Sequence, residues 1–176
     1  MAKVGIAAIL VTIIALLLLS MLPSFLQRRE PPVPTYINYF AYGSNLDENV
    51  LAQRVGGAFP KRVPATVQNY RLVFSGPASI ERQEGEVVYG ALYRLTEEQM
   101  MLLDRSEGVP YSYVRIPVEA VSGRAVVQAE AYQFALYRNF SKPSASYLQI
   151  IRTGYSDLGH PQEAYAALER AAGGES

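Results

Sequence analysis

Residues 39–46 read YFAYGSNL, an aromatic and apolar run that breaks into the small polar loop GSNL at 43–46. The alternating, tyrosine-rich pattern before the break predicts a β-strand over 36–42. A strand that breaks into Gly-Ser-Asn ahead of a helix can simply end there, or it can form a small anion site. The rest of the chain has to distinguish these two interpretations.

Two residues of the loop stand at the spacing of helix-capping pairs. Ser44 precedes Asp47 by three residues and Asn45 precedes Glu48 by three, which predicts a short helix over 47–55. The first backbone N–H groups of a helix lack intrahelical acceptors and carry partial positive charge, so the loop could also hold a carboxylate. Capping pairs are far more common than ligand sites, so the spacing alone favours simple capping.

Further strands and helices follow along the chain. Runs rich in Val, Tyr and Phe predict four more strands, and capping residues, Gly and Pro predict three more helices. Thr96 and Gln99 form a capping pair, Gly154 is expected to end the third of the four helices, and Pro161 to open the last. The predicted strands are 65–74, 86–95, 111–121 and 124–136, and the helices are 97–105, 144–153 and 161–172. Because strands dominate and do not alternate regularly with helices, we expect an α+β fold with a curved or barrel-like sheet.

The N-terminal region has a different composition from the rest. Residues 4–22 form an uncharged apolar run of about the length that crosses a bilayer as a helix, and no A-x-A cleavage pattern follows it. We therefore expect a retained, single-pass membrane anchor over 1–23 that contacts lipid through 4–22, followed by a proline-rich linker over 24–35. The main domain is expected over 36–171, with a tail over 172–176. The positive-inside tendency slightly favours a cytoplasmic position for the domain.

The composition narrows the chemistry before any motif is considered. The chain has 176 residues, no cysteine, one histidine and a formal net charge of zero. Disulfides, thiolate nucleophiles and multi-histidine metal sites are therefore excluded, and we expect neither metal nor cofactor. No long basic run is present, which argues against a nucleic-acid partner. Proton transfer would have to fall to a carboxylate or a tyrosine.

Glu107 is the carboxylate in the most unusual position. The second predicted helix, 97–105, ends near Asp104, and Glu107 follows it just before Gly108. A helix C-terminus carries partial negative charge, which is unfavourable for a structural carboxylate but useful for a general base. A solvated turn residue remains the ordinary alternative, and Glu81, Glu84 and Glu86 are further candidates.

A series of motifs runs along 36–170, and these motifs are short individually but specific together. They are Tyr42-Gly43-Ser44-Asn45-Leu46, Ala65 with Tyr70-Arg71-Leu72-x-Phe74, Val88-x-Gly90-Ala91-Leu92-Tyr93-x-Leu95, Leu103-Asp104-x-x-Glu107-Gly108, Tyr113-x-Arg115, and Pro143-Ser144-x-x-Tyr147 with Gly154. The order of these motifs resembles the gamma-glutamylcyclotransferase-like family, which includes the AIG2-like proteins.

The resemblance implies a small mixed β-barrel with surrounding helices and a specific reaction. The free α-amine of a γ-glutamyl group would attack its own γ-carbonyl, so that 5-oxoproline closes and an amine or amino acid leaves. By resemblance, Glu107 is the general acid/base. The loop of Gly43, Ser44, Asn45 and Leu46 holds the glutamyl group, Tyr113 and Tyr147 line the pocket, and Tyr42 belongs to the same motif.

Two questions stay open at the level of sequence. The leaving group is not identified, although the asparagine of YGSN is less typical of the glutathione-specific branch. The membrane anchor departs from the usual pattern of this family, whose members are mostly soluble. It favours an alternative function, a non-catalytic accessory subunit of a membrane protein complex that retains the fold.

Overall fold

The structure is a computed structural model that describes residues 34–59 and 61–174. The predicted membrane anchor, and all but the last two residues of the predicted linker, lie outside these residues. Within the described ranges, no helix is both long and apolar enough to span a membrane.

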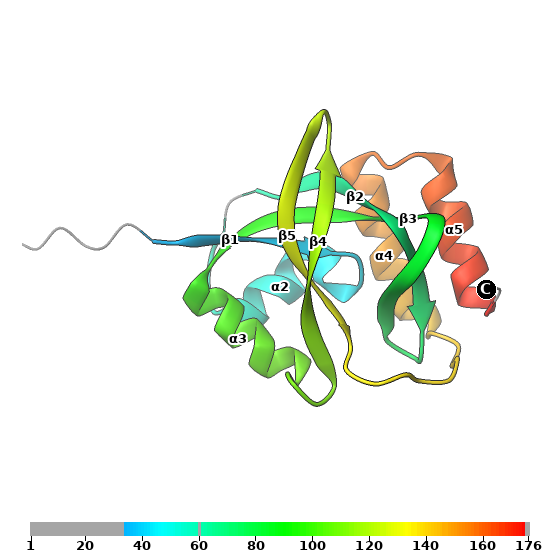
Figure 1. Cartoon of the computed structure of the whole chain (residues 1–176), viewed down its shortest axis with the longest axis horizontal. Helices are drawn as coiled ribbons and strands as arrows, with labels where there is room; N and C mark the ends of the chain where they lie inside the picture. The colour runs from blue at the N-terminus through cyan, green and yellow to red at the C-terminus, as the bar shows by residue number, and fades with distance from the viewer. Residues whose placement is uncertain (1–33, 60, 175–176) are drawn as a thin grey trace, which may run out of the picture. The chain divides into compact units, whose positions relative to one another are not determined.

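Five strands form one sheet that closes on itself (Figure 1). They are β1 (Tyr36–Ala41), β2 (Val63–Phe74), β3 (Ala78–Thr96), β4 (Tyr113–Ser122) and β5 (Ala125–Phe134), in the order β1-β3-β2-β4-β5. Neighbouring strands pair antiparallel, and a parallel bridge between Tyr39 and Glu130 joins β1 to β5. The predicted α+β class is thus confirmed.

Helices cover two sides of this sheet. They are the 3-10 turn η1 (Ser44–Leu46), α2 (Glu48–Val55), α3 (Glu97–Glu107), α4 (Ala145–Leu158) and α5 (Gln162–Gly173). In Figure 1, α4 and α5 lie together in the right half of the view, where β2 and β3 pass in front of α4, and α3 lies at the lower left. Thr96 and Gln99 form the predicted capping box of α3, and Gly108 ends that helix in the left-handed conformation.

The strand β3 begins eight residues earlier than the sequence predicts. Its first half carries the polar run Glu81-Arg82-Gln83-Glu84, which lacks the apolar alternation of a half-buried strand. In the structure this half pairs with the end of β2, from Tyr70 opposite Arg82 to Phe74 opposite Ala78. The register shifts between Gln68 and Tyr70, where Asn69 has a positive φ and its side chain accepts from the Gly85 N–H. Much of this polar run faces solvent, which explains why the pattern missed it.

Gly154 does not end α4, contrary to the prediction. The helix continues to Leu158, and Gly159 ends it with a φ of 67°. Gly154 is instead buried against η1, where a Cβ atom would lie 2.7 Å from the Leu46 Cβ. The residue is therefore a close-contact point between the helix and the turn, and a glycine signal of this kind is easily mistaken for a helix stop.

Candidate functional site

Nearly all of the sequence-predicted site residues meet at one small cavity of about 140 Å³. Tyr42, Gly43, Ser44, Asn45, Glu107, Tyr113 and Tyr147 line it. Leu46 does not line it and is fully buried, packed against Gly154. The lining also includes residues that the sequence analysis did not single out: Tyr39, Arg54, Pro77, Ala78 and Tyr132.

The turn after β1 forms one wall of the cavity. The backbone N–H of Leu46 donates to the Gly43 carbonyl at 3.0 Å, and the N–H of Asp47 donates to the Ser44 carbonyl at 3.1 Å. Gly43 has a negative φ, so the backbone conformation does not require glycine at this position. A Cβ there would lie 2.7 Å from the Tyr147 hydroxyl, so glycine is needed for this close approach.

Ser44 and Asn45 do not cap α2, although their spacing alone favoured capping. Asp47 is the capping residue, and its carboxylate accepts from the N–H groups of Asn49 and Val50. Asn45 is 4% exposed, and its side chain is used inside the site instead. The side chain of Asn45 is therefore not a helix cap and lies at the cavity.

Asn45, Arg54 and Glu107 form a hydrogen-bonded network. Arg54 Nη1 donates to Asn45 Oδ1 at 2.6 Å and to Glu107 Oε1 at 3.1 Å. Asn45 Nδ2 donates to the same Glu107 oxygen at 3.0 Å and to the Tyr39 hydroxyl at 2.7 Å. Both donors therefore hold Glu107 through Oε1. Within the described residues no hydrogen bond reaches Oε2, the oxygen that is available for proton transfer.

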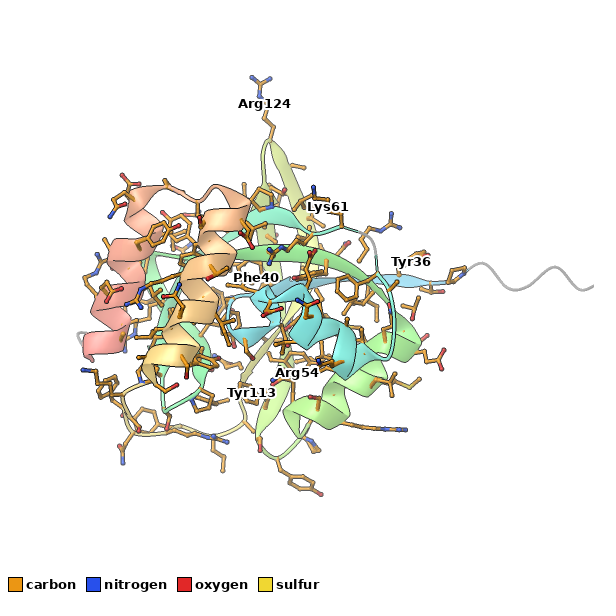
Figure 2. All side chains as sticks on the ribbon, turned by 180° about the vertical axis from the view of Figure 1, so that it is seen from behind. Tyr36, Phe40, Arg54, Lys61, Tyr113 and Arg124 are labelled. Atoms are coloured by element: carbon orange, nitrogen blue, oxygen red, sulfur yellow. The ribbon has the colours of Figure 1, made fainter. Side chains whose placement is uncertain are left out.

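Arg54 lies on α2 and Tyr113 lies on β4, and both residues are labelled in Figure 2. Their side chains line the same cavity although they are far apart in the sequence. Among the cavity's lining residues, Arg54 is the cation and Glu107 the carboxylate. Their side chains are 30% and 14% exposed, so the pair is shielded from bulk water but reachable from the cavity.

Glu107 is the last residue of α3. About one turn earlier in the same helix, Asp104 forms an ion pair with Arg115 that holds the helix in place. Arg115 of β4 donates to both carboxylate oxygens of Asp104, and the Tyr132 hydroxyl donates to Asp104 Oδ1 at 2.8 Å. Burial by itself raises the pKa of Asp104, but the hydrogen bonds from Arg115 and Tyr132 outweigh it, and the pKa is lowered. The Asp of the Leu-Asp-x-x-Glu-Gly motif thus ties the end of α3 to β4 and β5.

Five tyrosine hydroxyls surround the cavity as neutral groups. Burial raises the pKa of each of them, so they stay protonated at neutral pH: Tyr39, Tyr42, Tyr113, Tyr132 and Tyr147. Tyr42 donates to the Tyr132 carbonyl, and Tyr113 donates to the Ala78 carbonyl at 2.7 Å. Tyr147 accepts from the Ala78 N–H at 3.2 Å. The site thus combines one carboxylate, one cation and several neutral donors around a space for a small polar molecule.

A larger cavity, of about 420 Å³, lies elsewhere, against β2, β3 and α5. The carboxylate in its lining is Glu81, whose Oε1 already accepts from Arg71 at 2.5 and 2.8 Å. Glu81 was one of the alternative candidates for the carboxylate, but Glu107 and the other site residues expected from the family motifs do not line this cavity. The smaller cavity is therefore the candidate site, because the groups able to transfer protons converge there.

Comparisons with known proteins identify similar sequences. A sequence model described as "Gamma-glutamyl cyclotransferase, AIG2-like" matches residues 39–153. A mouse protein named gamma-glutamylcyclotransferase is 30% identical over 143 residues, which cover 71% of this chain and 73% of that protein. The human protein of the same name is 29% identical over 150 residues, 74% of this chain and 78% of that protein.

A solved structure also matches this fold. It is of a protein named gamma-glutamyl cyclotransferase, aligns with a TM-score of 0.65 at 25% identity, and covers 77% of this chain and 87% of that one. The region matched by the family model contains every residue proposed for the site. The chain therefore belongs to the gamma-glutamyl cyclotransferase, AIG2-like family of enzymes.

Proposed function

We propose that this protein cyclises a γ-glutamyl group to 5-oxoproline and releases the attached amine or amino acid. The observation that carries the proposal is the Glu107 carboxylate, held through Oε1 by Asn45 and Arg54 at the wall of a small, tyrosine-lined cavity. A cavity of about 140 Å³ suits one glutamyl group and leaves the rest of the substrate outside.

The charges of the cavity are complementary to those of a glutamyl group. That group carries one ammonium and one carboxylate, and the lining offers Glu107 and Arg54. Guanidinium is well suited to carboxylates, and the turn at Gly43 and Ser44 adds backbone N–H groups at the start of η1. In this arrangement the α-carboxylate lies toward Arg54 and the turn, and the α-ammonium lies at Glu107.

Glu107 would act as base and then as acid. It takes a proton from the α-ammonium, and the free amine attacks the γ-carbonyl carbon. The new C–N bond closes the ring, the C–N bond to the leaving group breaks, and the protons removed from the ring nitrogen go to the leaving nitrogen. Because the nucleophile is tethered to its own electrophile, the protein has to orient the chain and move protons, with no covalent intermediate.

A panel of γ-glutamyl compounds tests the proposal. The full-length protein is incubated with a γ-glutamyl amino acid, a γ-glutamylamine and glutathione, and 5-oxoproline is measured by mass spectrometry. The matched control is the α-glutamyl isomer of the same dipeptide, which cannot release its second residue by this reaction. We expect 5-oxoproline from at least one γ-glutamyl compound and none from the α-isomer. Absence of 5-oxoproline from every compound would contradict the proposal.

We further propose that residues 4–22 anchor the enzyme to a membrane as a single-pass helix, with the domain on the cytoplasmic side. The support is the sequence alone, since this stretch lies outside the described residues. The full-length protein should require detergent and keep its first residues. A mature N-terminus near residue 24, or solubility without detergent, would contradict the anchor. A stable membrane complex without any cyclisation would favour the accessory-subunit function.

A further inference from the structure

Tyr39 presents a hydroxyl proton that the surrounding network leaves uncommitted. Arg54 can only donate, so the Asn45 atom that it contacts must be the amide oxygen. The Asn45 NH₂ group therefore faces Glu107 and Tyr39 and donates one hydrogen to each. Because the Tyr39 oxygen accepts one of these hydrogens, its own proton must point away from Asn45.

The surroundings of Tyr39 direct that proton into the cavity. Tyr39 is 3% exposed, yet it lines the site. Among the described residues, no oxygen accepts a hydrogen bond from its hydroxyl. Tyr42, Tyr113 and Tyr132 differ, because each donates to an oxygen of the protein.

The ring of Tyr39 is also fixed in place. It stacks on Tyr93 with centroids 6.3 Å apart and meets the edge of Tyr132 at 5.6 Å. Tyr93 in turn donates a hydrogen bond from its hydroxyl to the backbone carbonyl of Asn45 at 3.0 Å. A buried donor that cannot move away is the kind of group that stabilises charge developing in a transition state.

We propose that Tyr39 is a further substrate-contacting residue, and that its hydroxyl donates a hydrogen bond to the γ-carbonyl oxygen of the glutamyl group. The inference rests on the proposed cyclisation. No atom is transferred: the phenol keeps its proton and stabilises the oxygen as it becomes an oxyanion. Burial raises the pKa of Tyr39, so the donor persists well above neutral pH.

The position of Tyr39 relative to Glu107 selects the carbonyl as its acceptor. Both side chains contact the same Asn45 nitrogen, at 2.7 and 3.0 Å. The attacking amine must lie at Glu107, and in a reactive conformation the carbonyl carbon lies about 3–3.5 Å from that amine. The charged α-carboxylate is matched by the cation Arg54, which leaves the neutral phenol for the neutral carbonyl.

The test compares two ligands that differ at this carbonyl. 5-Oxoproline keeps the former γ-carbonyl as its ring C=O, whereas L-proline has a five-membered ring with the same α-carboxylate, no carbonyl, and a charged ring nitrogen in place of the neutral lactam N–H. The comparison between wild type and variant cancels this charge difference. Binding of both is measured by calorimetry to the full-length wild type, Tyr39→Phe and the control Tyr155→Phe. Tyr155 is also buried and donates its hydroxyl to a backbone carbonyl, that of Tyr89 at 3.2 Å, away from the cavity.

We expect Tyr39→Phe to reduce the preference for 5-oxoproline over proline about 3- to 10-fold, the effect of one net hydrogen bond. Its kcat should fall about 10²-fold, as for loss of an oxyanion donor. Tyr155→Phe should keep the wild-type preference. If Tyr39→Phe does not fold, 3-fluorotyrosine at position 39, a more acidic phenol of nearly the same size, should increase the preference.

Two results would overturn the inference in distinguishable ways. If the wild type forms 5-oxoproline but Tyr39→Phe weakens both ligands equally, the hydroxyl only orients Asn45 and does not touch the carbonyl. The same holds if the fluorinated phenol leaves the preference unchanged. If the wild type neither forms nor binds 5-oxoproline, the proposed function fails, and the role of Tyr39 fails with it.

Discussion

At the scale of single residues, the site depends on a few side chains that each make several contacts. Asn45 uses both amide hydrogens and its carbonyl oxygen, and Arg54 uses one nitrogen for two acceptors. Buried polar groups that are fully paired have one favoured orientation, whereas removal of one partner leaves the others unsatisfied. Substitutions here should therefore disturb the orientation of the side chains that remain.

Replacing Arg54 with Met tests its role in holding Glu107. Met keeps much of the length and apolar volume but removes both hydrogen bonds and the charge. We expect kcat/KM to fall at least about 10-fold, with a stability loss of about 1 kcal/mol or less because the pair is partly exposed. Arg152→Met, which removes a surface pair with Glu169 at 2.6 Å, is the control and should keep wild-type kinetics. If Arg54→Met and Arg152→Met have the same kinetics, Arg54 does not contribute to the activity of the site.

Gly43→Ala tests the close approach of the turn to Tyr147. The added Cβ would lie 2.7 Å from the Tyr147 hydroxyl, so either the turn or the tyrosine, both of which line the cavity, must shift. We expect KM to rise about 10-fold or more while the protein stays folded. Gly57→Ala is the matched control, because no heavy atom lies within 4 Å of its added Cβ. An unchanged KM in Gly43→Ala would show that the turn does not shape the binding site.

At the scale of elements, α3 and α4 position the two ends of the site. Glu107 ends α3, whose position is fixed by the contact of Asp104 with β4 and β5. Ser144 caps α4 by accepting from the N–H of Tyr147, which places this tyrosine in the first turn. The Pro-Ser-x-x-Tyr and Leu-Asp-x-x-Glu-Gly motifs are therefore helix-positioning motifs as much as chemical ones.

Asp104→Asn should weaken the attachment of α3 in a pH-dependent way. The folded-state pKa of Asp104 is lowered relative to its ordinary value, so its contribution is present above about pH 4 and is lost as the pH falls through the lowered pKa. We expect a loss of about 1–3 kcal/mol in unfolding free energy at pH 7, measured by urea denaturation. The difference from wild type should shrink toward pH 3. A difference that is the same at both pH values would contradict this assignment.

Gly154→Ala tests the contact between α4 and the turn. In an exposed helix interior this change would stabilise by up to about 1 kcal/mol. Here the added Cβ would lie 2.7 Å from the Leu46 Cβ, so we expect a lower melting temperature and a net loss of about 1–3 kcal/mol. An increase in melting temperature would show that the helix can move away from the turn at little cost.

At the scale of the whole molecule, the site is assembled from β1, η1, α2, the start of β3, the end of α3, the β4–β5 pair and α4. The sequence predicted the α+β class and most helices and strands, because their periodicity and capping residues are local signals. The motifs also singled out Glu107 and most of the turn, and the structure brings these residues to one cavity.

The remaining residues could not be predicted from local pattern. Arg54 occupies a place in the last turn of α2 where a basic residue is ordinary, and Tyr132 alternates as a normal strand residue. Tyr39 looked like one more aromatic residue of β1. Only the closure of the sheet and the packing of α2 near α3 bring these side chains to the cavity, and a linear sequence carries no direct record of those contacts.

Production of 5-oxoproline by Glu107→Gln, measured against wild type and Glu119→Gln, tests the central claim most directly. Gln keeps the volume of Glu107 and its ability to accept from Asn45 and Arg54, but it cannot exchange a proton at neutral pH. Glu119 is exposed and lies outside the cavity lining, so its substitution is the matched control. We predict that Glu107→Gln loses about 10²–10⁴ in kcat with an unchanged fold, and that Glu119→Gln retains wild-type activity. Near-normal release of 5-oxoproline by Glu107→Gln would contradict the account.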